Sequence, residues 1–242
     1  MALHVGTSGW AYTEWRPAFY PAHLTPPDFL SYYASVLGAC EINATHYRLP
    51  STDTVARWAA SVPADFRFAV KAHQRITAGT TIDLTGSARA RLARFLDTVA
   101  GLGDRLGAVL LQYQEDCPRD DGALASALAT LPGGVPFVVQ FKHPSWDDPA
   151  VARLVADHGA ALAIAETDGD VLEALPPGPL AYVRLRAERY DDAARHGWRA
   201  VLDTEARHRP VFAIARHQGI PAGNPHAGVG LAQWLSLPAM NK

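Results

Sequence analysis

The chain has 242 residues, of which 48% are hydrophobic, and this size suits one large globular domain. Its 22 basic and 24 acidic residues give a formal net charge of −2, so no global positive field attracts nucleic acid or a membrane surface. No stretch reaches the ~18 apolar residues that a membrane span requires, and no export signal precedes the first strand pattern. The two cysteines match neither a disulfide framework nor a metal motif, so we predict a cytoplasmic protein without a membrane partner.

Eight strand patterns follow one another along the chain. We expect strands at residues 3–8, 40–45, 66–72, 108–112, 137–142, 161–166, 181–186 and 211–215. The pattern at 108–112 is apolar up to its last residue, which is typical of a strand that is covered on both faces. Strands of this kind indicate a parallel sheet.

Helical patterns separate most of these strands. We expect helices at about 25–37, 51–62, 88–102, 123–131, 149–159, 198–207 and 229–235, and a short helix between the sixth and seventh strands. The first of them has a threonine cap followed by prolines and ends at Gly38. Because no linker or repeat interrupts the alternation, the sequence predicts an α/β fold, a single (β/α)8 TIM-like barrel over residues 1–242.

The C-terminal ends of the predicted strands carry polar side chains. In such barrels the functional face is built from these ends and the loops that follow them. Four of the side chains there are basic, namely Lys71, Lys142, Arg184 and Arg186. Their convergence on one mouth would hold a small anionic ligand such as a phosphate, a carboxylate or a sugar phosphate.

Acidic residues at the same ends are candidates for proton transfer. Strand alternation over 40–45 would place Glu41, Asn43 and Thr45 on one face, and an ionised carboxylate there needs a cation or a wet cavity. Glu41 is therefore either an acid or base, or the structural partner of Lys71 or Arg184. Glu166 and Asp168 follow the sixth strand as further acids.

The loop that begins at His143 supplies one more candidate for catalysis. His143 precedes Pro144, so it either transfers a proton or orients the loop. The candidate catalytic residues are thus Glu41, Lys71, His143 and Asp168, and the candidate binding residues are Trp10, Asn43, Tyr47, Arg48, Gln112, Gln140, Lys142, Arg184 and Arg186.

Two other kinds of site are weighed on the same face. The aromatic residues Trp10, Tyr12, Trp15 and Tyr47 either stack on a ring of the ligand or pack in the fold. The histidines at 46, 73, 143 and 217 and the nearby acids are metal-ligand types, but no spacing selects them, so we predict neither a metal nor a cofactor.

Several motifs in chain order resemble one known family. They are Gly6-Thr7-Ser8-Gly9-Trp10, Trp15, Phe19-Tyr20-Pro21, Glu41-Ile42-Asn43, Tyr47-Arg48-Leu49-Pro50, Phe68-Ala69-Val70-Lys71, Val109 to Gln112, His143-Pro144-Ser145-Trp146 and Tyr182-Val183-Arg184-Leu185. Over roughly the first three quarters of the chain, this order is similar to the domain of unknown function 72 family, also called YecE-like. The resemblance implies a TIM-barrel-like fold without an established activity, comparable to the endonuclease IV type of barrel.

The chain departs from the family pattern near the predicted site. Where the family usually has Glu and Arg before the histidine motif, this chain has Gln140 and Lys142, and where it usually has His-Gly after the seventh strand's arginine, this chain has Arg186-Ala187. The end of the last strand, Arg216-His217-Gln218, also only approximates the pattern. An amide cannot act as a base, so a general base at position 140 would be lost here.

Three hypotheses for function follow. The first is an enzyme, a hydrolase or lyase, acting on a small phosphorylated or otherwise anionic compound, with Glu41 or Asp168 moving a proton. The second is a nuclease-like protein acting on a nucleic-acid phosphate, which the net charge of −2 disfavours. The third is a non-catalytic ligand-binding descendant, suggested by Gln140 and Arg186.

Overall fold

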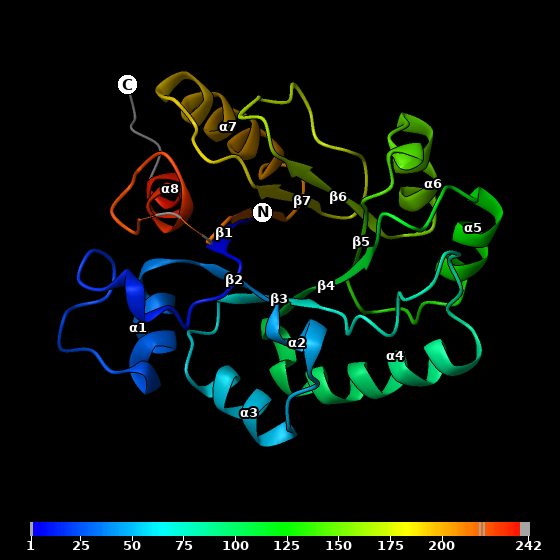
Figure 1. Cartoon of the computed structure of the whole chain (residues 1–242), viewed down its shortest axis with the longest axis horizontal. Helices are drawn as coiled ribbons and strands as arrows, with labels where there is room; N and C mark the ends of the chain where they lie inside the picture. The colour runs from blue at the N-terminus through cyan, green and yellow to red at the C-terminus, as the bar shows by residue number, and fades with distance from the viewer. Residues whose placement is uncertain (1, 218, 220, 238–242) are drawn as a thin grey trace.

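The predicted barrel is confirmed. The structure is a computed structural model that describes residues 2–217, 219 and 221–237. Eight parallel strands close into a ring in sequence order, and the helices lie around the outside of this ring (Figure 1). The strands are β1 (Leu3–Thr7), β2 (Ala39–Ile42), β3 (Arg67–Lys71), β4 (Leu106–Tyr113), β5 (Phe137–Phe141), β6 (Ala161–Glu166), β7 (Ala181–Leu185) and β8 (Val211–Ala215). Pairing of β8 with β1, from Leu3 opposite Val211 to Thr7 opposite Ala215, closes the ring.

Eight α-helices are described, and four of them begin after a capping side chain. They are α1 (Phe29–Val36), α2 (Ala44–Tyr47), α3 (Thr52–Ala60), α4 (Gly86–Val99), α5 (Asp121–Ala129), α6 (Pro149–Asp157), α7 (Asp192–Glu205) and α8 (Gly228–Ser236), with short 3-10 segments at Thr13–Trp15, Pro26–Asp28, Ala100–Arg105 and Pro144–Trp146. Ser51, Asp120, Asp148 and Asp191 each accept a hydrogen bond from a backbone N–H of the first turn that follows. None of the helices in the described part of the chain has the length and apolar character needed to cross a membrane.

The expected second strand is wrong in its second half. β2 ends at Ile42, and the chain then turns into the short helix α2. Thr45 lies in this helix, where its hydroxyl is 2.8 Å from the Ile42 carbonyl and donates to the Lys71 carbonyl at 2.6 Å. A threonine hydroxyl that lies between the carbonyls at two strand ends and donates to one of them favours the turn over continued pairing. Thr45 and Asn43 therefore do not share a strand face with Glu41.

Two expectations about helices are also wrong. The segment 167–180, all of it described, contains no helix between β6 and β7. Instead, Glu166 Oε1 accepts hydrogen bonds from the backbone N–H groups of residues 168, 169 and 170, which fixes a turn. Helix α7 begins at Asp192 rather than near Trp198, because Asp191 caps the Ala194 N–H.

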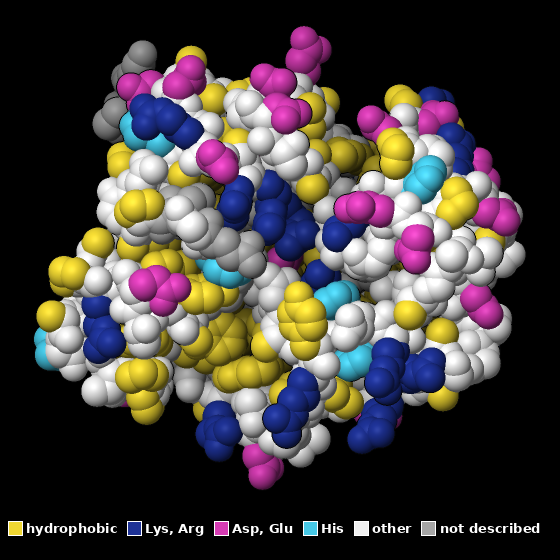
Figure 2. Space-filling view, viewed as in Figure 1, with side chains coloured by type: hydrophobic (Ala, Val, Ile, Leu, Met, Phe, Trp, Pro, Cys, Tyr) yellow, Lys and Arg dark blue, Asp and Glu magenta, His cyan; other side chains and the backbone are white. Residues whose placement is uncertain are grey.

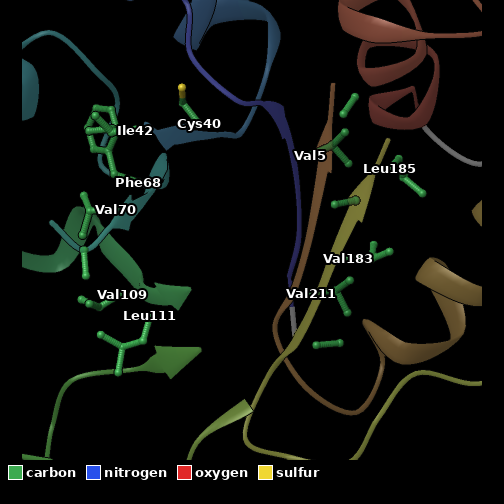
Figure 3. Packing of buried hydrophobic residues seen from close by; sticks show 14 of the residues in the cluster. Val5, Cys40, Ile42, Phe68, Val70, Val109, Leu111, Val183, Leu185 and Val211 are labelled. Atoms are coloured by element: carbon green, nitrogen blue, oxygen red, sulfur yellow. The ribbon is translucent and has the colours of Figure 1, made fainter. Parts of the chain in front are cut away.

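Two apolar layers hold the barrel together. Outward-facing strand residues pack beneath the helices, as Figure 3 shows for Val5, Cys40, Ile42, Phe68, Val70, Val109, Leu111, Val183, Leu185 and Val211. A second buried cluster consists of the alternate strand residues and includes Ala39, Ala69, Ala108, Leu110, Val138, Tyr182, Phe212 and Ile214. Side chains two residues apart on a strand share a face, so this second cluster fills the barrel interior.

The interior becomes polar toward the C-terminal ends of the strands. Two residues beyond the apolar positions 69, 110, 138 and 182 lie Lys71, Gln112, Gln140 and Arg184, all of them buried. Strand alternation places each of these four on the same face as the apolar residue before it. This polar layer forms the base of the candidate site.

Candidate functional site

A cavity of about 490 Å³ opens at the C-terminal mouth of the barrel. It is lined by Tyr12, Asn43, Ala44, Tyr47, Lys71, Gln112, Gln140, Lys142, Ala165, Thr167, Arg184, Arg186 and His217. All four predicted basic residues are among them, and the described lining contains no Asp or Glu. Figure 2 shows Lys and Arg side chains gathered in a hollow near the centre of this face.

The floor of the cavity is a network of buried hydrogen bonds. Arg184 Nη2 donates to Glu41 Oε1 and Arg184 Nη1 donates to Gln140 Oε1, both at 2.8 Å. Gln112 Nε2 donates to the same Gln140 oxygen at 2.7 Å. Two donors on one oxygen fix the orientation of the Gln140 amide. Gln140 therefore holds Arg184 and Gln112 in place at the centre of the mouth.

Glu41 has no exposed surface and does not line the cavity. Its second oxygen accepts a hydrogen bond from the Tyr182 hydroxyl at 2.8 Å. Burial, together with the adjacent Glu41 carboxylate, raises the pKa of Tyr182 well above its usual value, so this hydroxyl remains a donor. Between the two structural interpretations of Glu41 that the sequence allows, the geometry pairs it with Arg184.

Lys71 has a different environment. Its side chain ends β3 at the cavity wall with 8% exposure, and it makes no hydrogen bond or ion pair within the described part of the chain. Burial lowers the pKa of Lys71 to about 8, and the charges of Arg184, Lys142 and Arg186 contribute to this decrease. The cavity thus has an excess of positive charge that an anionic ligand would neutralise.

His217 lines the cavity from the end of β8, the strand that pairs with β1 to close the ring. Its Nδ1 is 2.7 Å from Ser8 Oγ, and its ring stacks on Tyr12 with a centroid distance of 4.4 Å. Burial, followed by the charge of Arg186, lowers the pKa of His217 to about 4. A neutral imidazole therefore faces the cavity at pH 7.

Five of the sequence-based candidates lie outside the cavity lining. They are Trp10, Glu41, Arg48, His143 and Asp168. Trp10 packs edge-on against Trp58 at a centroid distance of 5.6 Å. His143 Nδ1 accepts the Ser145 N–H, so this ring orients the loop, while Asp168 is exposed in the turn that Glu166 holds. The other eight candidates, Asn43, Tyr47, Lys71, Gln112, Gln140, Lys142, Arg184 and Arg186, are brought together.

From the sequence, we considered Tyr12 only for ring stacking and His217 only as a metal-ligand type, and we did not consider Thr167. Tyr12 and Thr167 belong to loops after β1 and β6, and their place at the cavity depends on loop conformation rather than on strand alternation. His217 carried a usable signal, because it directly follows the eighth strand pattern at the expected functional face.

No group of three or more metal-ligand side chains comes together among residues 2–217, 219 and 221–237. The histidines considered as ligands are engaged separately. His46 Nδ1 contacts the Ala72 carbonyl oxygen, His73 Nδ1 accepts the Arg75 N–H, and His217 faces Ser8. The polar layer of the mouth is built from amides and cations instead.

A closed ring of eight parallel strands with a polar, basic C-terminal mouth defines a barrel of the TIM type. Within this class, the chain belongs to the family described as protein of unknown function DUF72, whose model matches residues 4–238. The UPF0759 protein YecE of Escherichia coli is 27% identical over 145 residues, 60% of this chain and 50% of the relative. The UPF0759 protein YunF of Bacillus subtilis is 22% identical over 157 residues, 61% of this chain and 53% of the relative. The chain thus spans about half the length of the curated relatives that it matches.

Solved structures share the fold. A DUF72 family protein from Thermotoga maritima superimposes with a TM-score of 0.76 at 21% identity, covering 97% of this chain and 98% of the other. One from Enterococcus faecalis gives 0.67 at 17% identity, with coverages of 96% and 95%. A D-psicose 3-epimerase, solved in the presence of D-fructose, gives 0.55 at 13% identity, with coverages of 92% and 88%. At these identities the likeness concerns the fold alone.

Proposed function

We propose that this protein is an enzyme, a hydrolase or lyase, that acts on a small phosphorylated or carboxylated compound bound at the barrel mouth. The observation that carries the proposal is the charge of the cavity, where four basic side chains meet and no described lining residue is acidic. Cations held close together in a partly dry site repel one another, so an anion between them is stabilising. A cytoplasmic location belongs to the same proposal, supported by two buried free cysteines.

The proposed roles differ among the basic residues. Arg184 is held by Glu41 and Gln140, so the other N–H groups of its guanidinium are already oriented for a ligand. Arg186 and Lys142 lie at the same cavity with greater exposure and would close around the anion. Glu41 and Asp168, the acids expected to move a proton, lie away from the lining, so the proposed proton-transfer groups are Lys71 and His217, two lining residues with lowered pKa values.

Thermal unfolding with added anions tests this proposal. Inorganic phosphate at 10 mM should raise Tm by a few degrees relative to sodium chloride of equal ionic strength, because a ligand that binds only the folded state stabilises it. Arg186→Gln should remove most of this increase, since it deletes a cation from the cavity without touching the buried network. If neither phosphate, pyruvate nor sugar phosphates change Tm, the proposal is wrong.

One observation favours a second candidate, a ligand-binding protein that no longer catalyses. The side-chain oxygen of Gln140 accepts a hydrogen bond from Arg184 where the family usually has a glutamate carboxylate. Unlike a carboxylate, an amide cannot act as a base. The double variant Gln140→Glu, Lys142→Arg restores the usual family residues. Turnover of a phosphorylated or carboxylated substrate that appears only in this variant would favour the descendant over the enzyme.

A further inference from the structure

We propose that Lys71 is an amine nucleophile that forms an imine with the carbonyl carbon of an anionic aldehyde, ketone or 2-oxo acid. This inference rests on the proposed anion site and specifies its substrate class, a compound with a carbonyl group near a phosphate or carboxylate. The position of Lys71 carries the proposal, because its amine lies at the cavity wall without any partner in the described part of the chain.

Among the described charges that act on Lys71, only the Glu41 carboxylate favours its protonated form. The closest carboxylate that affects it is Glu41 on β2, and both Glu41 oxygens are already engaged by Arg184 and Tyr182. The other charges that act on it are those of Lys142 after β5, Arg184 on β7 and Arg186 directly after β7, and all three lower its pKa. The titratable residues His46, Tyr12, Tyr47 and His217 lie around it or line the same cavity, and none of them is an acid that is ionised at pH 7, so the environment favours the neutral amine.

The protonation equilibrium agrees with this geometry. With a pKa of about 8, roughly one in ten Lys71 side chains is neutral at pH 7, whereas an ordinary lysine is neutral in fewer than about one in a thousand molecules. A neutral amine is the form that attacks a carbonyl. Desolvation next to other cations is a recognised way to activate a lysine for this chemistry.

The use of lysine in this chain is itself informative. Only three of the 22 basic residues are lysines, namely Lys71, Lys142 and Lys242, and two of these line the cavity. Arginine serves almost everywhere else. Arginine cannot lose its proton in a protein, whereas lysine can. A lysine at position 71 can therefore become a neutral amine, which the arginines used elsewhere in the chain cannot.

The chemical step balances within the site. The Lys71 nitrogen adds to the carbonyl carbon, and a proton passes from nitrogen to oxygen to give a carbinolamine. Loss of water then leaves the C=N bond, so one carbonyl oxygen and two amine protons depart as water. Asn43 lines the same cavity and carries a buried Oδ1 without a partner in the described chain, so this side-chain amide is placed to accept a hydrogen bond from the carbinolamine hydroxyl.

Reductive trapping tests the inference with two probes. Pyruvate and dihydroxyacetone phosphate, each with sodium cyanoborohydride, distinguish a carboxylate from a phosphate as the anionic group. Intact-mass measurement and peptide mapping should find one reduced adduct at Lys71, at least ten-fold above Lys142 and Lys242 in the same sample. The trapping rate at Lys71 should rise with a midpoint near pH 8 and level off above it, and inorganic phosphate should suppress it.

A matched variant and two contrary results make the test decisive. Lys71→Arg keeps the charge but cannot form an imine, so it should abolish the adduct while the phosphate-induced rise in Tm persists. Because the site of labelling and its suppression by phosphate are measured on the unaltered chain, the test survives a poorly folded variant. Equal labelling of all three lysines, or no adduct at Lys71 with either probe, overturns the imine. If phosphate still raises Tm in that case, the anion site stands alone.

Discussion

At the scale of single residues, Glu41 shows how a polar residue can be necessary without contacting a ligand. Its carboxylate is fully buried, accepts from Arg184 and Tyr182, and provides the counter-charge for a buried guanidinium. Removing one partner of a buried ion pair leaves the other charge uncompensated, which costs far more than the pair contributes as a whole. Because the Arg184 guanidinium stays charged, Glu41 supplies the counter-charge that lets it remain buried at the mouth.

Glu41→Gln should lower the free energy of unfolding by about 3–5 kcal/mol, because it leaves Arg184 buried without a counter-charge. Urea denaturation at pH 7 measures this loss. Tyr182→Phe is the matched control, since it removes one hydrogen bond to the same carboxylate and should cost about 1–2 kcal/mol. A Glu41→Gln variant as stable as the parent protein would show that the carboxylate does not compensate Arg184.

At the scale of elements, the junction between β1 and β2 depends on a side chain from α1. The two strands pair at only two positions, Gly6 with Ala39 and Thr7 with Cys40. The Tyr33 hydroxyl accepts the Thr7 N–H at 2.8 Å and donates to the Ala39 carbonyl at 2.9 Å. A Cβ at Gly6 would lie 1.8 Å from that carbonyl oxygen, so glycine permits the close approach. Tyr33 thus bridges the two strands where their direct pairing is short.

Tyr33→Phe should reduce the free energy of unfolding by about 1–3 kcal/mol, because it leaves the buried Thr7 N–H without its acceptor. Thermal or urea unfolding measures the change. Tyr32→Phe on the same helix is the control, since the Tyr32 hydroxyl makes no hydrogen bond within the described residues, and its effect should stay below about 0.5 kcal/mol. Similar losses for the two variants would argue against a bridging role for Tyr33.

The elements also show how far sequence reasoning extends. The predicted strand ends placed Lys71, Gln140 and Arg184 at the C-terminal mouth, and the structure brings them together because parallel strands end at the same rim. Alternation was wrong beyond Ile42, where the Thr45 hydroxyl donates to the Lys71 carbonyl, lies 2.8 Å from the Ile42 carbonyl, and α2 forms. Such a turn depends on tertiary partners far along the chain, which no local pattern contains.

At the scale of the whole molecule, a near-neutral chain concentrates positive charge in one place. The net charge is −2, yet four cations meet at the mouth, and the acids that the sequence offered nearby are engaged elsewhere. Glu166 holds the turn at 168–170 and contacts the Tyr190 hydroxyl, while Glu41 pairs with Arg184. The sequence offered Arg184 as one possible partner of Glu41 but could not choose among the alternatives or assign a partner to Glu166, because the partners come from distant strands and loops. Because these acids do not line the cavity, its four cations repel one another, and this repulsion lowers the stability of the folded protein.

Replacing Lys71 measures that cost through its dependence on pH. The pKa of Lys71 is about 8 in the folded protein against a usual 10.5, so between these values the unfolded chain binds more protons and stability rises with pH. Lys71→Met keeps the apolar stem and removes the charge, so its Tm should exceed that of the parent at pH 7, and the difference should shrink from pH 8 toward pH 10. Lys142→Met, which removes an exposed cation from the same cavity, should change Tm less. A Tm difference that stays constant from pH 7 to pH 10 would mean that Lys71 is not held in a destabilising charged state, and that the mouth of the barrel does not favour the neutral amine.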